Sequence, residues 1–127
     1  KKLMNYIPAP YIRIYGVRVN KVINDPKKVD YYLGLLAKMK LNDSDKKEYM
    51  YLNASNLLIK GKTDSVAQIL KELVKLDRFN SQYYFVSGQL EYILGNKDGA
   101  KEMFKKAIEY DTNNLISKEA NQLLSQI

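Results

Sequence analysis

Residues 47–80 and 81–114 carry the same pattern of side chains, and the two segments align at a spacing of 34 residues without a gap. The small residue Ala54 falls on Gly88, and the turn residue Gly61 falls on Gly95. Apolar positions match as well: Met50, Leu52, Leu58, Val66, Leu70 and Val74 fall on Tyr84, Val86, Tyr92, Ala100, Phe104 and Ile108. An internal repeat of this length indicates one supersecondary unit that is built more than once and stacked on its neighbours.

Each copy has the spacing of two amphipathic helices joined by a short turn. We predict helices over residues 47–60 and 63–76 in the first copy, and over 81–94 and 97–110 in the second. Because the links are short, neighbouring helices should run antiparallel. In the second copy Gly88 on one helix faces Ala100, Phe104 and Ala107 on the other. Such small residues let two backbones approach closely while one ring fills the gap.

The small residue followed by an alanine–aromatic–alanine stripe resembles the tetratricopeptide repeat, a family with a period of about 34 residues. The resemblance covers residues 47–114. It implies an all-α fold in which antiparallel helix pairs stack as a short right-handed superhelix, a tetratricopeptide repeat solenoid. The chain departs from the family pattern at six positions: Arg78 and Thr112 replace the closing proline, Asn53 and Ser87 replace a leucine, Glu91 replaces a tyrosine, and Leu73 replaces the second alanine.

A partial repeat is predicted before these two copies, over residues 25–43. Asp25 and Pro26 stand in the order of a helix N-cap and a first helical residue, so a helix should run from Asp25 to about Leu41. Its stripe of Val29, Leu33, Leu36 and Met39 aligns with Val66, Leu70, Leu73 and Leu76 once three residues are inserted in the loop 42–46.

Residues 11–23 fit two interpretations. They are β-branched and partly alternating, which is typical of a strand. Ile12, Tyr15, Val19, Val22 and Ile23 also form a helical stripe. A lone strand would leave its backbone groups unpaired, so we favour a degenerate first helix, with a strand that pairs with a second copy of the chain as the alternative. Pro8 and Pro10 are predicted to exclude a regular helix over residues 1–10.

The chain should end in a capping helix over residues 115–126. Ile116, Ala120, Leu123 and Leu124 would face inward, and the opposite face is polar, as the last unit of a repeat array requires. The predicted domain organisation is therefore an N-terminal extension or degenerate first helix (1–24) and a repeat domain (25–127). The repeat domain comprises a partial repeat (25–43), two repeats (47–80 and 81–114) and the capping helix (115–127).

No constellation of residues points to catalysis. The chain has no Cys and no His, which excludes thiol and imidazole nucleophiles, the commonest general base and most zinc sites. Asp64 and Asp98 recur because they open the second helix of each pair, where a negative charge favours the helix N-terminus. Asp77 and Asp111 recur as the residues that close each repeat. We therefore predict a protein that is not an enzyme and needs neither a cofactor nor a metal ion.

The net charge of +7 is unevenly distributed. Residues 1–46 hold ten Lys/Arg against four Asp/Glu, whereas residues 81–114 hold four against five. A nucleic-acid binder usually carries a basic stripe along its helices, and here the excess lies in the least regular part of the chain, which argues against that partner. A basic N-terminal surface for nucleic acid or an anionic membrane, and self-association through residues 11–23, remain alternatives. No apolar run has the length of a transmembrane segment.

In the family that the chain resembles, the first helices of successive repeats line a concave groove that holds a peptide or helix of another protein. The resemblance places this groove on Glu48, Tyr51, Ser55, Leu58, Gln82, Phe85, Gln89 and Tyr92. The predicted groove is aromatic and uncharged beyond Glu48 at its head. It lacks the cations with which some members bind C-terminal carboxylates, so its ligand should be apolar or aromatic. The alternative is that the rings pack against neighbouring helices or the chain's own segment 6–11.

These observations favour a protein-interaction scaffold or adaptor. The bias towards Lys, Asn, Tyr and Ile suggests an AT-rich, bacterial genome. The chain begins Lys1-Lys2 rather than with Met, which suggests a processed or trimmed piece. The cytoplasm and the periplasmic side of a bacterial envelope assembly both remain open as its location.

Overall fold

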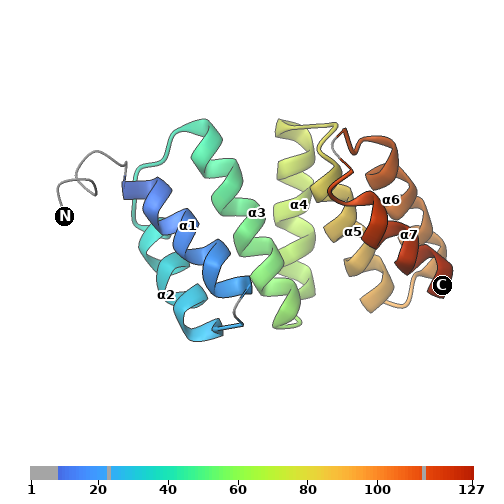
Figure 1. Cartoon of the computed structure of the whole chain (residues 1–127), viewed down its shortest axis with the longest axis horizontal. Coiled ribbons are helices and arrows are strands. Elements are labelled where there is room, and N and C mark those ends of the chain that lie inside the picture. The colour runs from blue at the N-terminus through green and yellow to red at the C-terminus, as the bar shows by residue number, and fades with distance from the viewer. Residues whose placement is uncertain (1–8, 23, 113) are drawn as a thin grey trace. The chain divides into compact units, whose positions relative to one another are not determined.

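The computed structural model describes residues 9–22, 24–112 and 114–127, and every regular element within those ranges is a helix (Figure 1). The helices are α1 (Ala9–Val22), α2 (Pro26–Ala37), α3 (Asp43–Ile59), α4 (Thr63–Leu76), α5 (Ser81–Ile93), α6 (Lys97–Glu109) and α7 (Ser117–Gln126). The all-α prediction is therefore confirmed for the described residues. The helical interpretation of residues 11–22 is confirmed by α1, and the strand alternative is wrong there. Residue 23 and segment 1–8, which includes Tyr6, lie outside the described residues.

Three helix boundaries differ from the prediction for local reasons. α1 begins at Ala9, since a proline such as Pro10 is tolerated in a first turn, where its missing N–H breaks no helical hydrogen bond. α3 begins at Asp43 rather than at residue 47, because the Asn42 side chain accepts a hydrogen bond from the Asp45 N–H (2.7 Å) and caps the helix. α2 ends at Ala37 rather than near residue 41. The N–H groups of the next two residues, Lys38 and Met39, bond to carbonyls three residues back instead of four.

The turns inside three successive helix pairs share one geometry. Asn24, Gly61 and Gly95 have φ angles of 59°, 76° and 84°, in the left-handed region. Each of them donates its N–H to the carbonyl three residues back, and the next residue donates to the carbonyl five residues back, over 2.8–3.3 Å. This pattern is a common helix C-terminus that favours glycine. The predicted equivalence of Gly61 and Gly95 is confirmed, and the same turn joins α1 to α2 with an asparagine.

The second helix of each pair buries three residues at the same spacing of i, i+4 and i+7. The buried sets are Val29, Leu33 and Leu36 in α2; Val66, Leu70 and Leu73 in α4; and Ala100, Phe104 and Ala107 in α6. This spacing places the three side chains on one face of a helix. The inward stripes predicted for α2 and α4 are therefore confirmed at their first three positions. Met39, the fourth residue of the first stripe, is partly buried, but Leu76, the fourth residue of the second, is 59% exposed.

The chain divides into two compact units, an N-terminal unit of residues 1–56 and a C-terminal unit of residues 57–127. The border falls inside α3 and hence inside the segment 47–80, so the extent of that repeat stays a prediction. In the N-terminal unit α1 packs on α2, and Ile14, Val17 and Leu52 join the buried residues of α2 in one core. The stripe predicted on Ile12, Tyr15, Val19 and Val22 lies outside the side chains that the structure describes.

The C-terminal unit is built on the pair α5 and α6. Contacts join Tyr84 to Tyr110 and Gly88 to Phe104, so residue numbers rise along α5 as they fall along α6 and the helices are antiparallel. A Cβ atom on Gly88 would lie only 2.5 Å from the Phe104 ring, which confirms the close approach predicted for this glycine. α7 packs on α6 and buries Ala120 in the same core, with Ile116, Leu123 and Leu124 packed around it as predicted.

Within the described ranges, no helix combines the length and the apolar composition needed to cross a membrane.

Candidate functional site

An open apolar pocket of about 430 Å³ lies in the C-terminal unit. Its walls come from the last turns of α3, α5 and α7, and the buried ring of Phe104 on α6 contributes part of its lining. The residues that line it are Leu58, Ile59, Gln89, Tyr92, Ile93, Phe104, Leu123, Gln126 and Ile127. No charged side chain is among them.

The repeat register explains why two of these walls resemble each other. Leu58 and Ile59 end α3, directly before the turn at Gly61, and Tyr92 and Ile93 hold the equivalent positions before Gly95. In both places the shared turn ends the helix and leaves its last apolar residues at the surface. Ile59, Tyr92 and Ile93 are 77%, 51% and 54% exposed. The pocket therefore lies beside an exposed apolar surface made from equivalent residues of two repeats.

The chemistry of the pocket favours an uncharged, apolar ligand. Side chains of Leu, Ile, Phe and Tyr provide most of the lining, while Gln89, Gln126 and the Tyr92 hydroxyl provide the polar groups. An apolar side chain that enters such a pocket is removed from water, which is favourable. A charged group would lose its hydration there without gaining an ion-pair partner.

The structure brings three of the eight predicted groove residues together in this pocket: Leu58, Gln89 and Tyr92. Gln82 lies at the other end of α5, where it lines a smaller pocket near the loops that follow α4 and α6. Ser55 is half-buried in the N-terminal unit. The groove was predicted from residues of both units, and as a whole it stays a prediction.

The other three predicted groove residues are engaged within their own units. Phe85 is a correction: it is only 7% exposed, and its ring centroid lies 5.7 Å from that of Phe104, so it belongs to the core and not to a binding surface. Tyr51 packs against the core of the N-terminal unit. Glu48 accepts hydrogen bonds from the Arg18 guanidinium, through Nε at 3.1 Å and through Nη2, and so forms an ion pair with α1.

Sequence reasoning missed several residues of the pocket: Ile59, Ile93, Leu123, Gln126 and Ile127. The aligned pair Ile59 and Ile93 was a usable signal, because each lies two residues before a turn glycine and no following helical turn covers it. The residues of α7 gave no such signal. Leu123 was predicted to face inward, but only the packing of α7 on α6 places it beside the end of α5.

The pKa values of Lys21 and Asp111 are shifted, and neither residue lines the pocket. Burial lowers the pKa of Lys21, although the nearby Glu48 carboxylate opposes that shift. Burial raises the pKa of Asp111, but hydrogen bonds from Ile116, Ser117 and Leu115 outweigh that effect and lower the pKa to about 2. These bonds also explain why α7 begins at Ser117: Asp111 accepts the Ile116 and Ser117 N–H groups at 2.9 and 2.8 Å.

Carboxylates do not gather into a site in the described part of the chain. Asp64 and Asp98 lie in the first turns of α4 and α6, as predicted. Among the described residues, no group of three or more acidic side chains is placed to hold a metal ion. Comparison of the chain with protein-family models and with curated proteins gave no match.

Proposed function

We propose that this chain is a protein-interaction module of the tetratricopeptide repeat type, whose apolar pocket takes an aliphatic or aromatic side chain from a segment of another protein. It acts by binding and positioning its partner rather than by catalysis.

The repeat geometry supports the family assignment. The same left-handed turn recurs at Asn24, Gly61 and Gly95, and the same buried spacing recurs in α2, α4 and α6. The contact of Gly88 with Phe104 supplies the small-residue and large-ring pairing that the family pattern implies. Three helix pairs built to one pattern are what a short solenoid needs, because each pair covers an apolar face of its neighbour.

The single observation that carries the binding proposal is the uncharged pocket beside exposed Ile59, Tyr92 and Ile93. Exposed apolar residues that stand singly are ordinary, but a contiguous group beside a concavity is typical of an interaction site. A tyrosine at the rim adds a large contact area together with a hydroxyl that can hydrogen-bond the partner. Among the described basic residues of the N-terminal unit, Arg18 is paired with Glu48 and Lys21 is partly buried.

Selection from a random peptide library tests this function. We expect the full chain to enrich uncharged segments with one or more aromatic or large aliphatic residues. Tyr92→Glu combined with Ile93→Glu should weaken binding of the enriched peptides by about tenfold or more, because it places two carboxylates at the rim of an apolar pocket. Both positions are more than half exposed, so the fold should survive, as circular dichroism would show.

Tyr31→Glu is the control, because Tyr31 is also a tyrosine that is more than half exposed, on α2 in the N-terminal unit. This variant should bind the enriched peptides as the unaltered chain does. Equal binding of the enriched uncharged peptides by the Tyr92/Ile93 variant, or no enrichment of uncharged peptides at all, would contradict the proposed function of this pocket.

A further inference from the structure

A second groove crosses the C-terminal unit between α4 on one side and α5 and α6 on the other. It measures about 460 Å³ and shares no residue with the apolar pocket. Ala67, Leu70, Lys71, Val74, Lys75, Tyr84, Ser87, Leu90, Glu91 and Met103 line it. We propose that this groove docks an acidic, amphipathic segment of a partner protein, which inserts an aliphatic side chain and sets carboxylates against the lysines of the wall.

The floor of the groove is apolar. Leu70 and Leu90 are buried at its base, and Val74 and Met103 are half-buried on either side of them. Methionine is unbranched and polarizable, so it adapts to side chains of different shape. The floor is therefore suited to an inserted leucine, isoleucine or methionine, which a wholly charged ligand such as a phosphate backbone would not provide.

The walls carry charge at defined places. Lys71 and Lys75 line the groove from α4, and the Lys106 ammonium on α6 lies 5.8 Å from the centre of the Tyr84 ring, which also lines it. α4 and α5 are joined by the short link 77–80, so they run antiparallel and Lys75 lies at the same end of the groove as Tyr84. Lys71 and Lys75 thus line the groove itself, and Lys106 lies beside it at the Tyr84 ring.

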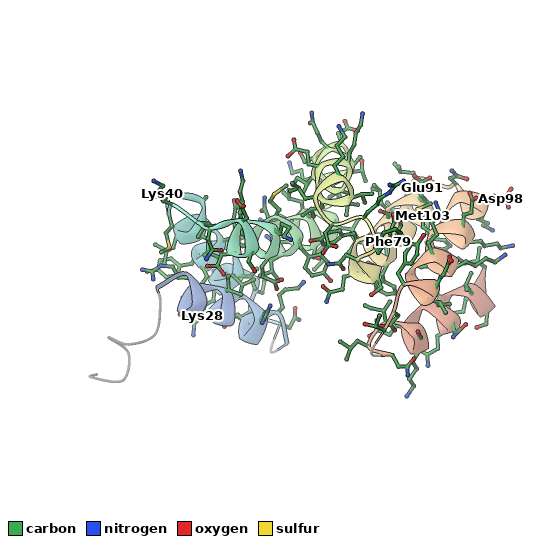
Figure 2. The ribbon with its side chains drawn as sticks, turned by 90° about the horizontal axis from the view of Figure 1, so that it is seen from above. Lys28, Lys40, Phe79, Glu91, Asp98 and Met103 are labelled. Carbon is green, nitrogen blue, oxygen red and sulfur yellow. The ribbon has the colours of Figure 1, made fainter. Side chains whose placement is uncertain are left out.

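The opposite end carries one carboxylate, and that carboxylate is already bonded. Glu91 accepts a hydrogen bond from the Asn96 amide over 2.8 Å, and Asn96 also caps α6 by accepting the Gly99 N–H over 3.0 Å. Figure 2 shows Glu91 and Met103 together on this part of the unit. The described ion pairs do not join Glu91 to Lys71, Lys75 or Lys106, so these ammonium groups stay available to an acidic ligand.

The groove is fixed before any ligand arrives. The Tyr84 hydroxyl donates to the Arg78 carbonyl over 2.8 Å, and its ring lies 5.3 Å from that of Tyr110. Ser87 donates to the Tyr83 carbonyl over 2.9 Å. Walls that are already ordered lower the entropy lost on binding. Charge complementarity then selects the partner. Carboxylates of the partner segment are attracted to the lysines of the groove, and segments that carry lysines at those positions are repelled.

The probe for this proposal is a labelled synthetic helix with leucines on one face and glutamates beside them, titrated with the full chain by fluorescence anisotropy. We expect saturable binding that weakens as salt is added, since partly exposed charges are screened. Lys71→Glu combined with Lys75→Glu should weaken this binding by about tenfold. A second probe, in which lysines replace the glutamates, should bind the unaltered chain poorly and should bind the Lys71/Lys75 variant better.

Lys97→Glu combined with Lys118→Glu is the control, because it changes the net charge equally at exposed positions that do not line the groove. It should bind the acidic probe within about twofold of the unaltered chain. No binding of the acidic probe, equal loss in both double variants, or failure of the lysine probe to recover binding would each overturn the proposal. The Tyr92/Ile93 variant should bind the acidic probe as the unaltered chain does. A result that contradicts binding in this groove can therefore be told apart from one that contradicts binding in the apolar pocket.

Discussion

The helix pair α1–α2 and the helix pair α5–α6 have the same backbone plan but use different side chains to build it. In α5–α6 a Cβ on Gly88 would meet the Phe104 ring at 2.5 Å, and in α1–α2 a Cβ on Gly16 would meet the Tyr32 ring at 2.9 Å. The Phe104 ring is buried, whereas the Tyr32 side chain, which ends in a hydroxyl, is half-buried. We therefore expect α1–α2 to accommodate an added methyl group more readily than α5–α6.

The two units also differ in their buried polar side chains. Buried Asn20 in α1 donates to the Gly16 carbonyl over 2.7 Å, and buried Asn56 in α3 donates to Asp30 over 2.8 Å. These are the buried polar side chains of the described residues, and both belong to the N-terminal unit. That unit also holds eleven Lys/Arg against five Asp/Glu, while the C-terminal unit holds ten against nine. A core with buried amides must supply each of them with a hydrogen-bond partner, and here the Gly16 carbonyl and Asp30 do so.

The largest difference between the two helix pairs is expected when the rings of Phe104 and Tyr32 are removed. Phe104→Ala removes a fully buried ring from the centre of α5–α6 and should lower the free energy of unfolding by about 3–5 kcal/mol. Tyr32→Ala removes a half-buried ring and should cost only about 1–2 kcal/mol. Urea denaturation of both variants measures the difference. Equal losses would mean that the two pairs are packed equally tightly.

Adding a methyl group at each close approach should give the next largest effect. Gly88→Ala should destabilise by about 1–3 kcal/mol, because the added Cβ would lie 2.5 Å from the buried Phe104 ring and would force that ring to shift. Gly16→Ala should be nearly neutral, since a shift of the half-exposed Tyr32 ring is offset by up to about 1 kcal/mol of helix propensity. Thermal unfolding of the two variants provides the measurement. A larger loss at Gly16 would reverse our comparison of the two pairs.

Asp77 and Asp111, the residues that close the two repeats, should differ in how strongly they hold the helix that follows each of them. Asp111 accepts hydrogen bonds from Leu115, Ile116 and both the N–H and hydroxyl of Ser117, whereas Asp77 accepts one from Asn80 over 3.1 Å. Asp111→Ala should therefore speed amide hydrogen exchange in α7, and Asp77→Ala should have a smaller effect at the start of α5. Similar exchange in both variants would show that the bonds of Asp111 do not hold α7 in place.

The same carboxylate sets a dependence on pH. The hydrogen bonds lower the pKa of Asp111 to about 2 from its ordinary 3.8, so its ionised form is favoured in the folded protein. Its contribution is complete above pH 4 and is lost as the pH falls from about 4 to about 2. As the pH falls through that range, the protection of the α7 amides relative to their intrinsic exchange rates should fall in the unaltered chain but not in the Asp111→Ala variant. A parallel rise in both would point to other carboxylates.

The smallest expected effects concern the shared turn. Gly95→Ala should cost about 1 kcal/mol, because a residue with a Cβ is strained at a φ of 84°. Gly95→Asn should cost about half as much or less, since asparagine tolerates this conformation and already occupies it at position 24. Calorimetry of both variants, with Gly61→Asn as a parallel case, would measure the difference. Equal costs for alanine and asparagine would mean that Asn24 strains its own turn.

Much of the fold could be predicted because it depends on periodicity along the chain. The i, i+4, i+7 spacing of Ala100, Phe104 and Ala107 indicates which face of α6 is buried, whatever lies opposite. The position of Gly95 indicates a turn, because few other residues adopt its φ without strain. The candidate site was predicted only in part. Leu58, Gln89 and Tyr92 follow from the repeat register, but the register cannot say that Phe85 points into the core or that Arg18 reaches Glu48.

What the sequence determined by itself is thus the set of helices, their turns and their buried stripes, because these are local properties that each segment carries in its own pattern. Only the tertiary structure decided which apolar residues remain exposed. Ile93 and Phe85 lie on one helix and are both apolar, yet one is at the surface beside a pocket and the other is in the core. The difference arises because burial depends on which neighbour covers a face, and residues distant along the chain, such as those of α6 and α7, supply that neighbour.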